Sequence, residues 1–329
     1  MAPPFTTSAG AFLQSVLHPQ GIQAERIWNL WNLTLVLCGA VFFLIVTVFL
    51  YVLWRAPRST ATTKADVHNQ HSKRVHHIAI AWALGLSAAG LGSLFAVDML
   101  TARQLSQLLP DDALRIDLTG HQWWWQATYL NSAGAPDFIV ANELQLPVGR
   151  TVLINLRSDD VIHSLWIPAL HGKLDLIPGR TATLRLRADA PGSYRGQCAE
   201  FCGEQHALMA LLAIAKPAEQ YEAWAVSQRR PAAPPQTESA KHGLRVFLSN
   251  GCASCHTIRG TAAAGTLGPD LTHLAARETL AAGMLPNQRG HLAGWIANAR
   301  AIKPGVAMPP STLTPNDLHS LLDFMETLR

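Results

Sequence analysis

An uncharged stretch runs from Ile27 to Trp54, and it leaves this part of the chain few ways to fold. Its core, LTLVLCGAVFFLIVTVFLYVLW, is long enough to cross a bilayer as a helix, which needs about 20 apolar residues. A second uncharged stretch, from Ile78 to Val97, is richer in Gly and Ala. Trp and Tyr near the ends of these stretches favour membrane helices over the alternative of a buried core helix for the second. We therefore predict a transmembrane helical hairpin over residues 27–98.

The charges around these stretches predict their orientation. The connecting loop, residues 55–77, holds five Lys or Arg against Asp66, which accounts for the whole formal charge of +4. The external segment 1–26 carries only Arg26 as a basic residue, so the positive-inside rule places the loop in the cytoplasm and both termini outside. This segment lacks the features of a cleaved signal, so the first helix is expected to direct export. The neutral remainder gives no reason to expect nucleic-acid binding.

The pattern changes after Asp98 to short alternating runs such as Thr151–Arg157 and Thr183–Arg187. Pro and Gly pairs separate these runs, which is typical of a β-sandwich. We place this domain at residues 99–228 and a Pro-rich, semi-rigid linker at 229–236. Only 15% of the chain is charged, against about 25% in typical soluble domains, in agreement with a membrane portion.

Residues 237–329 have the periodicity of helices. We expect helices at Ser239–Ser249 and Leu292–Ala299, and a last helix with Thr314 as its N-cap and Pro315 in its first turn. The predicted fold is therefore multidomain, with a two-helix membrane hairpin, a β-sandwich and an all-α domain.

The segment CAEFCGEQHALM, residues 198–209, brings two thiols, an imidazole and a thioether together within one predicted sandwich. Sulfur and imidazole ligands suit copper. One thiolate is enough for a mononuclear site, whereas two can bridge a pair of copper ions. A further imidazole is needed from elsewhere, and His163 is the candidate. The alternatives are a disulfide or a Cys₂His₂ zinc site, and neither explains the thioether. The candidate ligands in the segment are Cys198, Cys202, His206 and Met209.

The helical domain contains the sequence CASCH at residues 252–256. Cys252 and Cys255 can form thioether bonds to heme, and the adjacent His256 can bind its iron, so the motif predicts a covalent heme c. A chance match or a plain redox C-x-x-C pair is the alternative. The segment KPGVAMP, residues 303–309, resembles the distal loop of small c-type cytochromes and implies Met308 as the second iron ligand, with Met284 and His273 as runners-up. The segment GPD at 268–270 resembles the loop whose proline carbonyl, here that of Pro269, orients the proximal His.

His163 together with CAEFCGEQHALM resembles the CuA site of cytochrome c oxidase subunit II, and the resemblance covers roughly residues 25–225. It implies a cupredoxin-like sandwich with a binuclear copper centre. Cys198 and Cys202 would bridge the two ions. The implied terminal ligands are His163, His206, Met209 and the carbonyl of Glu200. The Glu200 side chain would bind a magnesium ion shared with subunit I.

Two other segments match this family and one departs from it. In GHQWWW, residues 120–125, the resemblance implies Trp123 as the point where electrons enter. In GKLDLIPGR, residues 172–180, it implies contacts with subunit I and a role in proton exit for Lys173, Asp175 and Arg180. The departure is Ala79, which stands where the family often has a glutamate for proton uptake.

The resemblance implies the electron-entry subunit of a heme-copper oxidase in a bacterial inner membrane, with the copper and heme domains on the outer side. Its expected partners are subunit I, subunit III, and an external donor such as a cytochrome c or a quinol–cytochrome c reductase. The alternatives are a nitrous-oxide or nitric-oxide reductase subunit and a copper carrier. The two membrane helices and GKLDLIPGR favour the oxidase, and a carrier has no use for a covalent heme.

Overall fold

The computed structural model describes residues 14–56, 70–106 and 113–329. The chain divides into two compact units, one of Arg26–Leu108 and one of Met1–Glu25 with Leu109–Arg329. The predicted external segment 1–26 and cytoplasmic loop 55–77 lie partly outside the described residues, at 1–13 and 57–69.

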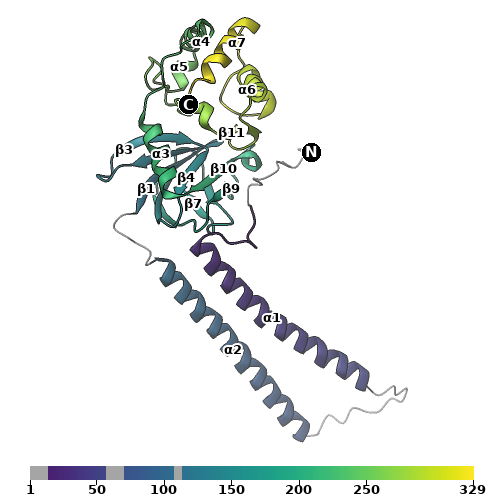
Figure 1. The fold of residues 1–329 in the computed structure, drawn as a ribbon. Coiled ribbons are helices and arrows are strands. Elements are labelled where there is room, and N and C mark those ends of the chain that lie inside the picture. The colour runs from purple at the N-terminus through teal and green to yellow at the C-terminus, as the bar shows by residue number, and fades with distance from the viewer. Residues whose placement is uncertain (1–13, 57–69, 107–112) are drawn as a thin grey trace. The chain divides into compact units, whose positions relative to one another are not determined.

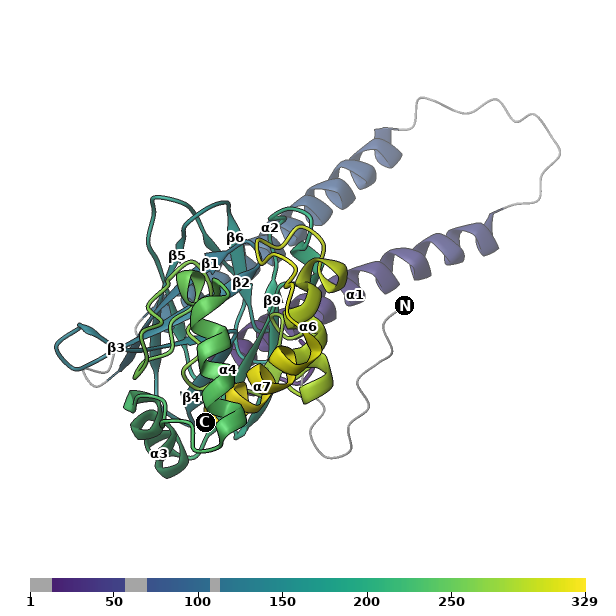
Figure 2. The same cartoon turned by 90° about the horizontal axis from the view of Figure 1, so that it is seen from above.

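The unit Arg26–Leu108 is a pair of long helices, α1 (Ile22–Arg55) and α2 (Gln70–Ser106). They run side by side in opposite directions (Figures 1 and 2). Arg26 Nη1 donates to Gln104 Oε1 at 2.5 Å and joins the start of α1 to the end of α2. Both helices are long and apolar enough to cross a membrane. Large apolar side chains such as Phe43 and Trp82 are exposed on the isolated chain, as expected of surfaces that meet lipid or another subunit.

The β-sandwich consists of two five-stranded sheets (Figure 1). The first has the order β3 (Pro136–Ala141), β2 (Trp124–Leu130), β1 (Leu114–His121), β5 (Val152–Ser158) and β8 (Ala182–Leu186). The second has the order β4 (Glu143–Pro147), β10 (Ala210–Lys216), β9 (Gly192–Cys198), β6 (His163–Trp166) and β7 (Leu174–Leu176).

Local sequence explains the strands and a turn between them. On β5, Val152, Ile154 and Leu156 are buried while the residues between them are partly exposed, which is the period of a strand with one face in the core. Between β7 and β8, Pro178 and Gly179 form a tight turn in which Arg180 N–H donates to the Ile177 carbonyl at 3.0 Å. Gly179 has φ of 75°, a conformation that glycine adopts without steric cost.

Helix α3 (Ala218–Arg229) covers one end of the sandwich and leads into the linker. The ring of Trp224 lies 5.3 Å from that of Tyr129 and 5.5 Å from that of Phe138. The linker itself is packed against the helical domain. Ala232 is buried, and its N–H donates to the Arg259 carbonyl at 2.8 Å.

The helical domain contains α4 (Glu238–Ser249), α5 (Cys252–Cys255), α6 (Arg289–Ile302) and α7 (Pro315–Met325). Helices α4 and α7 pack side by side (Figure 1), and Gly243 permits close contact with the backbone of Ser320. Thr314 caps α7 as predicted, because its hydroxyl accepts from Asp317 N–H at 3.2 Å. The predicted fold class is confirmed.

The sandwich and the helical domain belong to the same compact unit and share buried polar contacts. A short hairpin of β11 (Thr279–Leu280) and β12 (Leu285–Pro286) meets the sandwich at Glu143. Glu143 Oε1 accepts from the N–H groups of Glu278 and Thr279, both at 2.8 Å, and from the Thr279 hydroxyl at 3.1 Å. Burial raises the pKa of Glu143 to about 7, although these bonds and the charge of Arg277 oppose the change and the nearby Glu278 adds to it.

Replacing Glu143 with glutamine is expected to flatten the pH dependence of unfolding. The folded protein holds the Glu143 proton more tightly than the unfolded chain, so its contribution to stability is full below pH ~4.5 and is lost as pH rises to about 7. The whole change is at most ~3 kcal/mol. Thermal unfolding of the purified chain at pH 5 and pH 8 measures it, with the exposed Glu219→Gln as control. An unchanged pH dependence in Glu143→Gln would contradict the assignment.

Candidate functional site

The predicted copper ligands converge at one end of the second sheet. Cys198 is the last residue of β9, and Met209 directly precedes β10, so the loop between these strands returns to its starting point. His163 begins β6, which pairs with β9 through Leu165 and Cys198. The side-chain ligand atoms of His163, Cys198 and Cys202 lie within 4.8 Å of one another, and all three residues are buried.

Each thiol has its own imidazole. His163 Nδ1 lies 3.8 Å from Cys198 Sγ, and His206 Nδ1 lies 3.7 Å from Cys202 Sγ. The two sulfur atoms are 3.7 Å apart, well beyond the ~2.05 Å of a disulfide bond.

Two weaker donors complete the set, and each lies beside a different sulfur. Met209 Sδ is 3.9 Å from Cys202 Sγ, and the Glu200 carbonyl oxygen is 3.2 Å from Cys198 Sγ. These soft and imidazole donors fit copper. The predicted ligands are therefore brought together as two similar halves around a pair of thiols.

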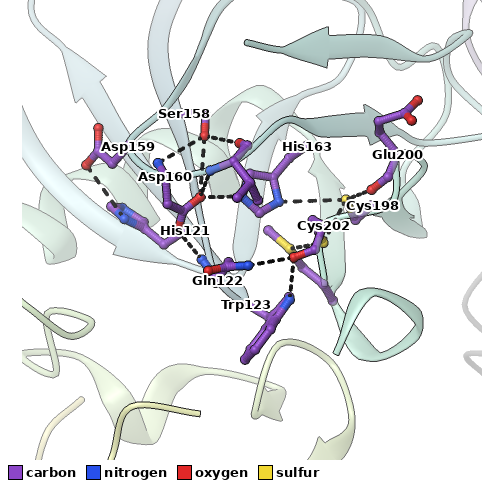
Figure 3. A network of polar contacts seen from close by, with 12 residues as sticks. His121, Gln122, Trp123, Ser158, Asp159, Asp160, His163, Cys198, Glu200 and Cys202 are labelled. Carbon is purple, nitrogen blue, oxygen red and sulfur yellow. Dashed lines mark hydrogen bonds and ion pairs between the residues drawn. The ribbon is translucent and has the colours of Figure 1, made fainter. Parts of the chain in front are cut away.

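His163 is oriented by a carboxylate that the sequence did not reveal as part of the site. His163 Nε2 lies 2.8 Å from Asp160 Oδ1 (Figure 3), so its N–H donates there and the Nδ1 lone pair faces the thiols. The Asp160 carboxylate also accepts from the N–H groups of Gln122 and Val161, both at 2.6 Å. An acidic residue three positions before a candidate ligand was the available sequence signal.

Metal binding requires thiolates, and the surroundings favour one at Cys198. The Cys202 thiol stabilises the Cys198 thiolate, and with His163 and the loop backbone it lowers the pKa of Cys198 well below its usual value, against the effect of burial. Burial lowers the pKa of His163, but contacts with Cys198 and Asp160 outweigh it and raise the pKa overall. The hydrogen bond that the Cys202 thiol makes to Cys198 raises the pKa of Cys202, and burial raises it further.

The three adjacent tryptophans have different surroundings. The Trp123 indole N–H donates to the Cys202 carbonyl at 2.9 Å, and Gln122 Nε2 donates to the same oxygen at 2.8 Å (Figure 3). Trp125 is fully buried in the sandwich core, and Trp124 stacks on His121 with ring centroids 4.3 Å apart. Only Trp123 is therefore bonded to the candidate copper loop, and its role in electron entry stays a prediction.

Two family models match this chain. Residues 128–215 match cytochrome c oxidase subunit II, periplasmic domain, and residues 240–329 match cytochrome c. Cytochrome c oxidase subunit 2 of Alkalihalophilus pseudofirmus is 31% identical over 318 residues, covering 96% of this chain and 91% of the relative. The chain belongs to the cytochrome c oxidase subunit 2 family.

Other similar proteins have the same description. Cytochrome c oxidase subunit 2 of Bacillus subtilis is 26% identical over 350 residues, covering 100% of this chain and 96% of the relative. The periplasmic domain of oxidase subunit II of Bradyrhizobium japonicum is 28% identical, covering 37% of this chain and 97% of the solved one, with a TM-score of 0.34. The prediction of an oxidase subunit is confirmed, and the matched families imply copper in the sandwich and heme c in the helical domain.

In this family member the Glu200 side chain points away from the thiols (Figure 3). Lys173 Nζ lies 3.3 Å from Glu200 Oε2. Lys173 Nζ also lies 3.9 Å from Asp175 Oδ1, and Arg180 follows in the same segment. The magnesium ligand and the subunit I contacts stay predictions.

The heme motif has the expected local geometry. Cys252 and Cys255 are free, half-buried thiols in α5, and His256 Nδ1 lies 2.8 Å from the Pro269 carbonyl oxygen. That contact assigns the proton to Nδ1 and leaves Nε2 available for iron. A side chain at Gly268 would come 2.6 Å from His256 Cε1, so the loop packs directly on the imidazole. These residues fit a heme c attachment.

The candidate distal ligands differ in their surroundings. Met308 is half-buried on the loop after α6. His273 is buried, and its Nε2 lies 3.1 Å from the Arg230 carbonyl oxygen, so this ring nitrogen already has a partner. Met284 is half-buried between β11 and β12. These surroundings disfavour His273, and Met308 stays a prediction from the resemblance of its loop.

Proposed function

We propose that this chain relays electrons from a covalent heme c to a binuclear CuA centre and on to subunit I, where oxygen is reduced to water. The observation that carries the proposal is the position of Trp123. Its indole N–H binds the Cys202 carbonyl, and its ring contacts the loop that begins at Lys303 and contains Met308. One side chain thus contacts both the candidate copper loop and the candidate heme loop.

The sandwich residues would hold two copper ions, and the helical domain would hold heme c. Cys198 and Cys202 would hold the ions through their thiolates, and bound copper would supply a one-electron acceptor. The terminal ligands would be His163, His206, Met209 and the Glu200 carbonyl. Asp160 would hold the His163 ring in its ligating tautomer. His256 and Met308 would bind the heme iron, a ligand pair that raises the reduction potential.

Several finer assignments follow from family membership. The Glu200 carboxylate would bind magnesium at the boundary with subunit I, and Lys173, Asp175 and Arg180 would contact that subunit. Subunit III would complete the assembly, and a cytochrome c or a quinol–cytochrome c reductase would supply electrons. Both soluble domains would lie on the outer face of a bacterial inner membrane.

The relay is tested by analysis of the purified complex followed by rapid kinetics. We expect two copper ions and one covalent heme per chain. After rapid reduction of heme c in the absence of oxygen, its oxidation should match the reduction of CuA in rate and amplitude. Reduction of CuA ahead of heme c by the physiological donor would overturn the order.

Replacing Met209 with leucine is expected to change the potential of the copper centre more than its copper content. Met209 Sδ lies 3.9 Å from Cys202 Sγ, where it would be a weak ligand that changes the potential of the copper more than it holds the ion. Redox titration and copper analysis of the variant measure the two effects. Met99→Leu in α2 is the control, because it makes the same change outside the sandwich. A loss of bound copper as large as the change in the redox signal of the centre would contradict this role.

Protease treatment of intact spheroplasts is expected to release the heme domain and spare residues 55–77. The positive-inside rule predicts this topology from the basic residues of the loop. Immunodetection of fragments with antibodies to the loop and to the C-terminal helix measures it, and lysed cells are the control. Cleavage within the loop in intact spheroplasts would contradict the predicted orientation and indicate the opposite one.

A further inference from the structure

Lys303 is buried where the helical domain meets the copper loop. It is 1% exposed, and its ammonium donates to three carbonyl oxygens. Two belong to the sandwich, those of Trp123 at 3.0 Å and Leu208 at 2.8 Å. The third, that of Ala281 at 3.3 Å, belongs to its own domain. An ammonium has three N–H donors, so this site satisfies all of them.

The turn between β11 and β12 directs three successive carbonyl groups into the same contact. Ala281, Ala282 and Gly283 all have positive φ, at 54°, 59° and 77°. For alanine this conformation costs roughly 1 kcal/mol or more, so other contacts must hold it. Besides the bond from Lys303, the Ala282 carbonyl accepts from Ala210 N–H at 3.1 Å and the Gly283 carbonyl accepts from Arg195 Nη1 at 3.1 Å. The turn is therefore shaped to fit the sandwich.

The loop after Lys303 continues along Trp123. A Cβ atom at Gly305 would lie 3.2 Å from Cη2 of the Trp123 ring and 2.6 Å from Glu204 Oε2. Glycine thus allows the backbone to approach the indole directly. Lys303 precedes the candidate ligand Met308 by five residues, so the position of its ammonium constrains the start of that loop.

We infer that Lys303 and Glu143 are positioning residues that form a reciprocal clasp, which holds the heme domain in one docked register with its Met308 loop against Trp123. Each domain contributes one buried polar side chain to acceptors or donors of the other: Glu143 accepts from the N–H groups before the turn, and Lys303 donates to carbonyls of the copper domain. This inference rests on the relay proposed above. It adds that the heme domain, which donates electrons to the copper centre, is fixed in position and does not move freely on a tether.

The clasp selects one register because buried polar groups without partners are costly. An ammonium or a carboxyl group buried without its hydrogen bonds loses its hydration with no compensation, so a shifted docking that still covers Lys303 is disfavoured. The docked register places the chain's own loop against the partly buried Trp123 ring. A separate cytochrome is then expected to reduce heme c.

Two pairs of variants test the clasp in the full chain. Lys303→Met removes the ammonium and leaves three carbonyls without their donor, and Lys241→Met makes the same change on the exposed face of α4. Glu143→Leu removes the carboxylate, and Glu143→Gln keeps an oxygen that can accept the same bonds. Amide hydrogen exchange at Ala210, whose N–H donates across the contact, reports docking without any need for copper.

We expect exchange at Ala210 to rise about tenfold or more in Lys303→Met and Glu143→Leu, since each variant leaves buried groups of the other domain without their hydrogen-bond partners. Electron transfer from heme c to CuA should slow by a similar factor while the heme spectrum stays native. Lys241→Met and Glu143→Gln should match the parent chain at pH 7 in both measurements. Native exchange and native transfer in both breaking variants would overturn the clasp but leave the relay standing. If the parent chain itself shows no transfer from heme c to CuA, the relay is wrong, and the exchange result alone decides whether the clasp holds.

Discussion

Replacing Cys202 with serine is expected to eliminate the binuclear copper centre. Cys202 Sγ lies beside Cys198 Sγ, His206 Nδ1 and Met209 Sδ. Its loss removes one of the two thiolates that would hold both ions, and His206 and Met209 lose the sulfur beside them. A hydroxyl is a poor ligand for copper compared with a thiolate. The expected loss in affinity for the second ion exceeds the ~100-fold that removal of an outer-shell partner causes.

Electron spin resonance and copper analysis of the purified chain measure this outcome. The parent protein should hold two ions and show one electron shared equally between them, whereas Cys202→Ser should hold at most one and show an isolated copper. Cys38→Ser is the matched control, because it makes the same change at an exposed cysteine in α1. A parent spectrum of one isolated copper would exclude the binuclear proposal.

The copper segment was readable from sequence because its chemistry is local. Cys198, Cys202, His206 and Met209 lie within twelve residues, and two strands that pair directly, β9 and β10, force the loop between them to return on itself. His163 is distant in sequence, yet it begins a strand that pairs with β9. Residue types and alternating strands therefore carried most of this prediction.

The contact between the domains could not be predicted in this way. Lys303 meets Trp123 across 180 positions, and Glu143 meets Thr279 across 136. A lone lysine before Pro304 and a lone glutamate at the start of a strand look like solvated surface charges, and no periodicity pairs them. Their burial depends on how two separately folded cores fit together, and hydrophobic patterning within either core does not encode that fit.

Removing the covalent heme is expected to slow reduction of the copper centre by the physiological donor by about 100-fold or more, the scale by which a tethered donor outcompetes a diffusing one. Cys252→Ser with Cys255→Ser removes both attachment thiols. An external donor then lacks the heme that would accept its electrons. Stopped-flow reduction of the purified complex, followed at the copper absorption band, measures the rate.

Methionine variants distinguish loss of the heme from a decrease in its reduction potential. Met308→Leu should keep the heme attached but lower its potential, because the sulfur ligand favours the reduced iron. Met284→Leu makes the same change in the turn between β11 and β12 and should leave the potential native. The reverse pattern would indicate that Met284, and not Met308, is the distal ligand of the heme iron. If the heme-less chain accepts electrons from the same donor as fast as the parent, the helical domain serves only as a docking platform, because electrons then reach copper without passing through His256 and its heme.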